Sequence, residues 1–545
     1  MSPRPAPPNP RSPPPLHHSR RRRAFHPPSD SLSALALPTA AAPPTTCHHC
    51  LTTSASKLLP CSACRAVSYC SKACQRASWK LVHKAECPAL KNVPSDRLLP
   101  TPVRALVQVA TRRDVWNAVM VGLVGNEAGF RGGGGWADLK MQGEMVRILM
   151  GGREGEWIGG GDVGAKYAVA MCKLLTNMFN VHDPDLGYDA VFLDGGLAMA
   201  NHSCMPNASA HIYGRTAILV ADEPIGADEE TNVSSDTSYP LAQRQLELEK
   251  YHFVCKCTRC TSDLNVYQAA RLLPASTVQA NAFSLLRNPS HLAEPPAAAS
   301  PPGPAAGTKL QSAIYEALDA LAEPSPVDAD ATPLLRSAFR ICEPLTRDSL
   351  WAMLPPSLVT QCLTHYLSRE DHVGAFLVTC LAACRIHPYG HPSPANPFRL
   401  KGALALCRAL SNAAADRSIF ASRVRDVHAR TRNVGPQGPG DVDVDVDVLA
   451  DLDAVATARM VFDMLAHYVA VTQVEGWPLE VQVKQGLEAV RGIPWGMDGG
   501  RKVMEEWERR EGGEGAWLGI WKRMVELLDG MAELGARLLL VDFAS

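Results

Sequence analysis

Apolar residues recur at helical spacing along much of the chain beyond residue 100. This spacing predicts helices over 103–120, 143–150 and 166–179, separated by glycine-rich loops. Between residues 186 and 233 the pattern changes to short apolar stretches broken by Gly and Asp, which predict strands at 208–212, 216–220 and 230–233. Helical spacing then returns at 308–323, 331–344, 357–368, 371–386, 397–413, 450–472, 478–490 and 513–540. The pattern therefore predicts a multidomain α+β chain whose last part is all-α.

The polar segments lie between these regions. Residues 1–46 are rich in Pro, Ala, Ser and Arg and are predicted to be a disordered tail. Its run Arg20–Arg23 fits a nuclear address or a solvated charge run. Residues 263–308 combine a helix with a Pro/Ala linker. The paired helices of 309–545 suggest a bundle or a tetratricopeptide-like array, although no clean 34-residue repeat is visible.

Length and charge narrow the function classes. A chain of 545 residues predicts three to four domains, and a net charge of −1 indicates no global polyelectrolyte partner. No run approaches the ~18 apolar residues of a membrane span, and no secretory signal is evident. We therefore expect no membrane partner and a reducing compartment, the nucleus or the cytoplasm. In such a compartment clustered cysteines are typical of metal sites.

Residues 47–87 carry eight metal-binding side chains in closely spaced pairs. The pairs are Cys47 and Cys50, Cys61 and Cys64, Cys70 and Cys74, and His83 and Cys87. Eight such ligands complete two tetrahedral zinc sites, and zinc binding would supply the folding energy of a segment this poor in large apolar residues. The stretch 74–87 is predicted to be a helix with Trp79 on its packed face, and His48 and His49 are expected to face solvent.

A second cysteine group spans a longer part of the chain. Cys204 lies about fifty residues before Cys255, Cys257 and Cys260, and the four thiolates suit one closed structural zinc site. Alternatively, Cys204 is a buried small hydrophobe and only the triplet matters. The other six cysteines lie in apolar stretches of the sequence and are expected to be buried thiols. They are Cys172, Cys342, Cys362, Cys380, Cys384 and Cys407.

The motif Asn-His-Ser-Cys-Met-Pro-Asn at 201–207, followed by Phe-Val-Cys-Lys-Cys-Thr-Arg-Cys at 253–260, resembles the SET and post-SET segments of protein methyltransferases. Together with the zinc-finger pattern, the chain resembles a divergent, fungal-type member of the SET-and-MYND-domain family. The resemblance implies S-adenosylmethionine as cofactor and a protein lysine as methyl acceptor. It also implies a MYND finger at 47–87, a helical insert at 88–180, a β-rich SET core at 181–253, a post-SET zinc loop at 254–262 and a helical C-terminal domain.

The resemblance also assigns roles to residues. Cys47, Cys50, Cys70 and Cys74 would hold one zinc ion and Cys61, Cys64, His83 and Cys87 another, so about three zinc ions per chain are expected with the post-SET site. Cofactor binding would fall to Asn177, Asn201, His202 and Phe253. Two alternatives stay open: Asn177 as a helix-ending residue, and Phe253 as packing against the zinc loop. The family implies that proline-containing peptides dock on the finger. The finger's net charge of +5 could instead meet an acidic protein or merely be solvated, and nucleic acid is not the expected partner.

Two positions depart from the family pattern. The family has a Gly-x-Gly turn before the finger, whereas this chain has no glycine between Met1 and Cys50. The family also has a catalytic tyrosine 34 residues after the motif asparagine, where this chain has Ser235, with Tyr239 four residues further on. Two hypotheses therefore remain: a protein-lysine methyltransferase, and a catalytically inactive adaptor that binds partner proteins. A misassigned reading frame of a real enzyme is a third.

Overall fold

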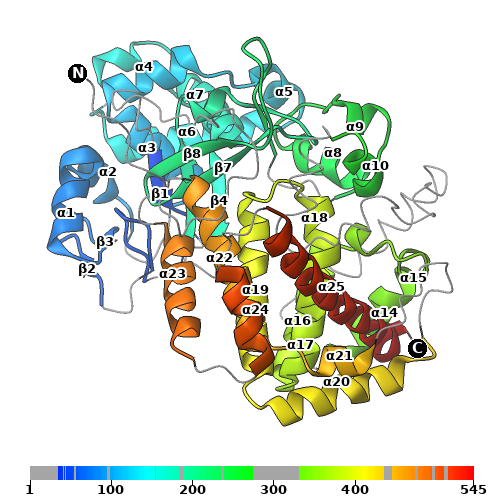
Figure 1. Ribbon diagram of the computed structural model, residues 1–545. Coiled ribbons are helices and arrows are strands. Elements are labelled where there is room, and N and C mark those ends of the chain that lie inside the picture. Colours follow the sequence, from blue (N-terminus) through cyan, green and yellow to red (C-terminus); the bar gives the residue numbers. More distant parts are fainter. Residues whose placement is uncertain are drawn as a thin grey trace, which may run out of the picture.

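Figure 1 shows the computed structural model. The structure describes residues 35–544 except 41, 43–44, 54–56, 95–98, 154, 184–187, 235–238, 274–329, 435–444, 473–476, 494–497 and 509–513. A small cysteine-rich unit lies at one edge, a mixed unit of strands and helices lies beside it, and the C-terminal helices form the other half (Figure 1).

A three-stranded antiparallel sheet is the centre of the mixed unit. It consists of β1 (Leu35–Pro38), β5 (Tyr188–Leu193) and β4 (Phe179–Asp183), in the order β1-β5-β4. Side chains of a strand alternate between its two faces. In β1, Leu35 and Leu37 therefore join the core under the helices, whereas Ala36 joins a separate cluster on the other face.

Strand β1 corrects the prediction of a disordered tail over 1–46. Leu35, Ala36 and Leu37 are at most 3% exposed and pair with β5, more than 150 residues away along the chain. Local composition did not indicate this order, because the burial that stabilises β1 comes from distant segments. Of the predicted tail, residues 1–34 lie outside the described part of the chain.

Five helices share one apolar core with the face of the sheet that carries Leu35 and Leu37. They are α3 (Thr101–Ala110), α4 (Arg113–Gly122), α5 (Glu127–Gly132), α6 (Trp136–Met150) and α7 (Val163–Asn177). The single helix predicted over 103–120 is two helices, with a break at Thr111 and Arg112. The apolar face of α3, including Leu106, packs in one core with Tyr167 and Met171 of α7.

A β-hairpin joins the two halves of the molecule. It consists of β7 (Ala208–Tyr213) and β8 (Thr216–Ala221), at the positions predicted for strands, and it turns at Gly214, whose φ of 55° is left-handed. Leu219 packs toward the sheet cluster, whereas Ile218 and Val220 belong to the C-terminal core. A second small pairing is parallel, between β6 (Asn201–His202) and β9 (Asn232–Val233).

The described C-terminal part is helical, as predicted. Its helices are α14 (Thr332–Ile341), α15 (Glu343–Arg347), η4 (Trp351–Met353), α16 (Pro356–Ser368), α17 (His372–Leu381), η5 (Ala382–Ile386), α18 (His387–Gly390), α19 (Pro397–Ala413), α20 (Arg417–Thr431), α21 (Val446–Ala450), α22 (Ala454–Thr472), α23 (Pro478–Arg491), α24 (Asp498–Glu508), α25 (Glu514–Leu539) and η6 (Leu540–Ala544). The helix predicted at 308–323 and the linker before it lie outside the described residues.

Within the described part of the chain, one helical stretch meets the length and composition of a membrane span. It runs over His372–Gly390 with a mean hydropathy of 1.2, and 89% of it is buried inside the protein. It packs against α19 and α25 at the centre of the C-terminal core. This burial is what the central helix of a globular helical domain requires.

Candidate zinc centres and cofactor site

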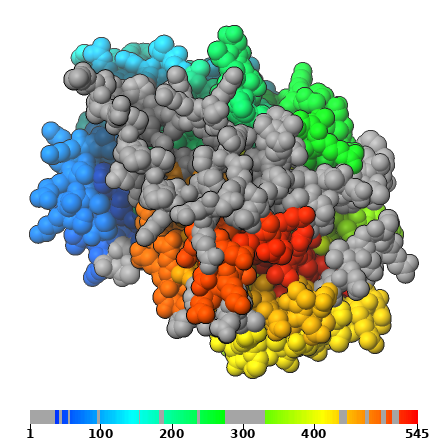
Figure 2. Space-filling model, in the orientation of Figure 1, coloured from blue at the N-terminus to red at the C-terminus, as the bar shows by residue number. Residues whose placement is uncertain are grey.

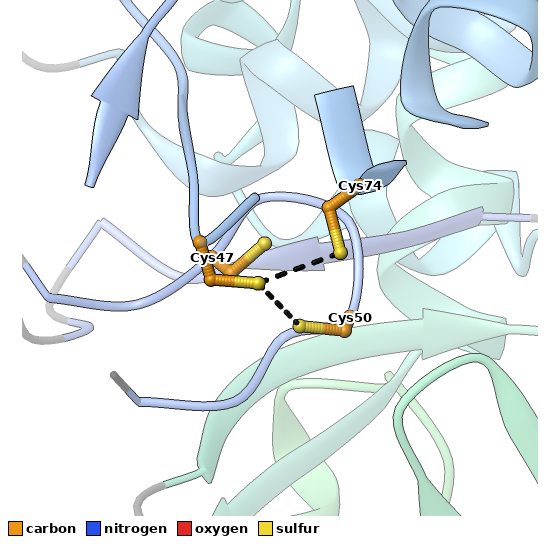
Figure 3. Close-up of side chains that lie close together, drawn as sticks. Cys47, Cys50 and Cys74 are labelled. Carbon is orange, nitrogen blue, oxygen red and sulfur yellow. Dashed lines mark hydrogen bonds between the residues drawn. The ribbon is translucent and has the colours of Figure 1, made fainter. Parts of the chain in front are cut away.

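The first finger cluster brings together Cys47, Cys50, Cys70 and Cys74, whose sulfur atoms all lie within 4.8 Å of one another. Figure 3 shows the sulfur atoms of Cys47, Cys50 and Cys74 converging on one point. The Cys50–Cys70 and Cys70–Cys74 sulfur distances are 3.8 Å and 3.5 Å. A tetrahedron with Zn–S bonds of about 2.3 Å has sulfur atoms about 3.8 Å apart, so this donor set fits zinc.

The second finger cluster consists of Cys61, Cys64, His83 and Cys87. The Cys61 and Cys87 sulfurs are 4.0 Å apart, and the Cys64 sulfur is 3.6 Å from His83 Nε2. The strands β2 (Leu59–Pro60) and β3 (Ser68–Tyr69) carry the loop with the first two ligands, and the helical run α1 (Lys72–Ser78), η1 (Trp79–His83) and α2 (Lys84–Leu90) carries the others. The two clusters thus interleave along the sequence, in the arrangement that the resemblance implied.

Glu86 orients the histidine of the second finger cluster and was not recognised from the sequence. Its carboxylate is 3.0 Å from His83 Nδ1 and accepts a hydrogen bond of 2.8 Å from Gln108 Nε2 of α3. Burial alone would raise the pKa of Glu86, but Arg104 and His83 lower it to about 2. A carboxylate on Nδ1 leaves Nε2 free to bind metal and makes it more basic. The His-x-x-Glu spacing on a helix was the available signal.

Two expectations for the finger are wrong. Trp79, the first residue of the π-helical turn η1, is 44% exposed rather than packed, whereas Val82 and His83 of the same turn are buried. His48 is partly buried instead of facing solvent: its Nδ1 lies 3.1 Å from both the nitrogen and the carbonyl oxygen of Ser68, and burial lowers its pKa to about 3. His48 therefore has a structural contact outside the two ligand sets.

The third cluster gathers Cys204, Cys255, Cys257 and Cys260. The Cys204 sulfur is 3.9 Å from that of Cys255 and 3.5 Å from that of Cys260, which again fits a zinc tetrahedron. Cys204 is buried, as the alternative expectation held, but it also lies among the other three thiols. Hydrogen bonding with the Cys204 thiol, assisted by Arg244, lowers the pKa of Cys260 to about 4. The six remaining cysteines are buried thiols, as predicted.

Three of the four expected cofactor residues lie beside the third cluster. Asn201 is exposed and its amide donates to Glu230, while His202 Nε2 lies 3.3 Å from the Cys204 sulfur. The His202 and Phe253 rings meet edge to face at 5.8 Å, and Phe253 is 38% exposed. An exposed amide and an exposed aromatic face thus flank one half-buried histidine.

Asn177 connects to this group through a short loop. It ends α7, and its amide donates to the carbonyls of Val124 and Lys173 at 2.7 Å and 2.8 Å. Two residues after Val124, Asn126 Nδ2 donates to the carbonyls of both Tyr251 and His252 at 2.7 Å. The loop 124–126 therefore joins the end of α7 to the segment that carries Phe253.

Asn126 and the helix after it are structural features of the candidate site that the sequence did not reveal. Asn126 adopts a left-handed backbone with φ of 46°, which asparagine tolerates better than most residues. The ring of Phe130 packs at 4.2 Å against that of His252, and a Cβ on Gly129 would lie 2.4 Å from His252 Cβ. The start of α5 thus fixes the backbone next to Tyr251 and Phe253.

Ser235 lies outside the described residues, so its predicted role as the tyrosine counterpart stays a prediction. The nearby Tyr239 is described, and its carbonyl accepts hydrogen bonds from Arg244 at 2.6 Å and Arg259 at 3.5 Å. Arg244 belongs to α8 (Leu241–Glu249), and Arg259 belongs to α9 (Thr258–Thr261).

Comparisons with known proteins agree with this geometry. Residues 47–87 match the MYND finger family. SET domain and MYND-type zinc finger protein 6 of Schizosaccharomyces pombe is 30% identical over 215 residues, which are 39% of this chain and 42% of that protein. Histone-lysine N-methyltransferase ASHR1 of Arabidopsis thaliana is 26% identical over 38% of this chain and 45% of that protein. Histone-lysine N-methyltransferase SMYD3 of Homo sapiens is 26% identical over 37% of this chain and 49% of that protein.

The chain is therefore similar to SET-and-MYND proteins over part of its length. The matched region covers less than half of the length of each of these three relatives. The family match at 47–87 coincides with the two finger clusters, and Figure 2 shows this finger, in blue, forming one flank of the molecule.

A pocket lies next to the third cluster. Its lining includes Met205 and Pro206, the carboxylates Asp222 and Glu223, and Tyr389 and Phe398 of the C-terminal half. The pocket is therefore bounded by both halves of the molecule and carries two carboxylates. Its wall also includes Cys204 and Arg259, so it borders the third cluster directly.

Proposed function

We propose that this protein is an S-adenosylmethionine-dependent protein-lysine methyltransferase that carries a MYND finger as a protein-binding module. The observation that supports the proposal most directly is the grouping of Asn201, His202 and Phe253 beside the third cysteine cluster. Relatives named histone-lysine methyltransferases support the reaction class. We further propose that the protein acts in the nucleus or cytoplasm and that its finger binds proline-containing peptides.

The chain's own residues suit the two ends of this cofactor. The exposed Asn201 amide would bind its amino-acid part, and the exposed face of Phe253 would stack on its adenine. When bound, the cofactor supplies an electrophilic methyl group on a sulfonium. The protein's task is to hold the cofactor and the acceptor amine in line and to exclude water, since alignment contributes many kcal/mol to such transfers.

The acceptor would reach this place from the neighbouring pocket. Asp222 and Glu223 give the pocket wall two negative charges against the one positive charge of Arg259, and Tyr389 and Phe398 give it apolar surface. A lysine side chain combines an apolar stem with a cationic head, so it is complementary to such a wall. A protein lysine is therefore the proposed acceptor.

A second candidate, the catalytically inactive adaptor, rests on Ser235. Serine at the expected tyrosine position lacks the ring that would line a lysine channel. Under this hypothesis the zinc finger and the C-terminal helices bind partner proteins, and no methyl group is transferred.

Radiolabelled methyl transfer separates the two candidates. The zinc-loaded chain is incubated with labelled cofactor, core histones and a lysine peptide library, next to the variants Ser235→Tyr and Phe253→Ala. The proposal predicts methyl-lysine with the natural chain or with Ser235→Tyr and its loss in Phe253→Ala. A chain that binds cofactor but yields no methyl-lysine, even as Ser235→Tyr, would favour the adaptor.

A further inference from the structure

The third cluster differs from the first finger cluster in its access to water. Cys204, Cys255 and Cys260 are 1%, 6% and 7% exposed, whereas only Cys47 of the first finger cluster is buried. A zinc ion with four thiolates carries a net charge of −2. At the first finger cluster water can solvate that charge, but a buried dianion needs compensating charge within the protein.

Two buried arginines stand at the third cluster. Arg244 and Arg259 are 3% and 2% exposed, although arginine is seldom buried without a reason. Arg244 Nη2 donates to the Cys260 sulfur at 3.6 Å, and Arg259 Nη1 donates to the Cys204 carbonyl at 3.3 Å. Guanidinium groups stay protonated in proteins, so the pair contributes a charge of +2.

We infer that Arg244 and Arg259 neutralise the zinc–tetrathiolate centre and connect it to the backbone at Tyr239. The charges of −2 and +2 cancel, and no water is required inside the site. The inference concerns the metal centre, and it holds whether or not the chain transfers methyl groups.

The side chains of Arg244 and Arg259 connect the zinc centre to the backbone at Tyr239. Both guanidiniums donate to the Tyr239 carbonyl, and Arg244 contacts a zinc ligand with its other nitrogen. Tyr239 lies two residues before the start of α8 and follows β9, the strand that pairs with Asn201 and His202. Zinc binding therefore fixes the chain entering α8, and Arg244 and Arg259 are positioning residues for that segment.

Zinc release tests the inference in the full-length chain. Transfer of zinc to an excess of a chromogenic chelator, whose absorbance changes when it binds zinc, is followed in the natural protein, Arg244→Met, Arg244→Lys and Lys250→Met. The matched control, Lys250, is an exposed cation just beyond the end of α8 that pairs with Glu247. We expect one zinc ion per chain to dissociate at least about tenfold faster from Arg244→Met, because the substitution leaves a buried negative charge uncompensated. Lys250→Met should match the natural protein, and Arg244→Lys should lie between them. Equal release from Arg244→Met and Lys250→Met would overturn the inference.

A charge-rescue variant distinguishes compensation from packing. Cys257→His replaces a half-buried thiolate by a neutral ligand and reduces the charge of the centre by one. The inference predicts that Arg244→Met accelerates release far less in the Cys257→His background. The same acceleration in both backgrounds would contradict it. If Arg244→Met does not fold, a folded, zinc-loaded double variant supports the inference and an unfolded one contradicts it.

Hydrogen exchange of the backbone amides in 239–248 tests the connection between the zinc centre and the backbone at Tyr239. We expect faster exchange in Arg244→Met, and unchanged exchange would refute the connection.

Discussion

Individual side chains in this protein take their roles from contacts with other residues, some close and some distant in the sequence. His83 is a metal ligand by spacing, but its orientation depends on Glu86, which in turn binds Gln108 of the next helix. The twelve candidate zinc ligands were predictable, because paired Cys and His spacing reflects local turns and helix faces. Asn126 was not, since its two carbonyl partners lie 125 and 126 residues away and no local pattern encodes them.

Glu86→Gln tests the role of that carboxylate. The variant keeps the size of the side chain but removes its charge, so we expect zinc affinity at the second finger cluster to fall by roughly 10- to 100-fold. Competition with a chromogenic chelator measures the change. Lys84→Gln, two residues away on the same helix and exposed, is the control and should retain the natural affinity. An affinity of Glu86→Gln equal to that of the control would show that the contact to His83 is dispensable.

At the scale of elements, the strength of the apolar pattern decided what could be predicted. Strongly patterned helices such as α16, α19 and α23 were predicted within a few residues. Helix α20 was missed because only the narrow stripe of Phe420, Val424, Val427 and Thr431 is buried, among many arginines. Helix α24 was missed because two glycines follow its first residue.

The Asp-Val repeat at 441–448 shows how a cap overrides a period-two pattern. The repeat alternates as a strand would, and its acidity favoured a loop. Its described end instead begins α21, where the Asp445 side chain accepts hydrogen bonds from the backbone nitrogens of Asp447 and Val448. Residues 441–444 lie outside the described part. A side chain that satisfies the first free N–H groups of a helix outweighs a weak local propensity.

Gly535→Ala tests the closest approach of two helices in the C-terminal core. A Cβ at residue 535 of α25 would lie 2.3 Å from the backbone oxygen of Leu377 in α17, so the helices must separate. We expect the free energy of unfolding to fall by about 1–3 kcal/mol, measured by denaturant titration. Gly519→Ala is the matched control in the same helix, because its Cβ would meet nothing within 4 Å. That variant should gain about 1 kcal/mol or less from helix propensity. Equal stability of the two variants would contradict the predicted crossing.

The whole molecule is held together by a core that crosses from the sheet unit to the helices. Ile218 and Val220 of β8 belong to the same cluster as the C-terminal helices, so the hairpin is buried on both faces. Beside it, His211 of β7 is 2% exposed and meets Trp477, at the start of α23, edge to face at 5.3 Å. This contact between the hairpin and the C-terminal helices was not predicted, because sequence patterns indicate which face of a strand is apolar but not which distant element covers it.

This contact makes stability depend on pH. Burial lowers the pKa of His211 from 6.5 to about 3, so the unfolded chain binds a proton below pH 6.5 that the folded chain does not. The contribution of the neutral His211 to the free energy of unfolding is present above pH 6.5 and is lost as the pH falls toward 3. We expect His211→Leu to reduce the slope of unfolding free energy between pH 6 and 4 by up to about 1.4 kcal/mol per pH unit. Denaturant titrations at several pH values measure the slope, and the exposed His372 provides the control His372→Leu. A slope unchanged from that control would mean that His211 is accessible to protons in the folded chain.

The central claim is that the group beside the third cluster binds S-adenosylmethionine, and calorimetric titration of the cofactor into the zinc-loaded chain tests it most directly. The account predicts saturable one-to-one binding that Asn201→Ala and Phe253→Ala each weaken, whereas Phe398→Ala, in the pocket wall of the other half, leaves it intact. No binding heat in a folded chain that holds about three zinc ions would contradict the claim and leave the adaptor as the function of this polypeptide.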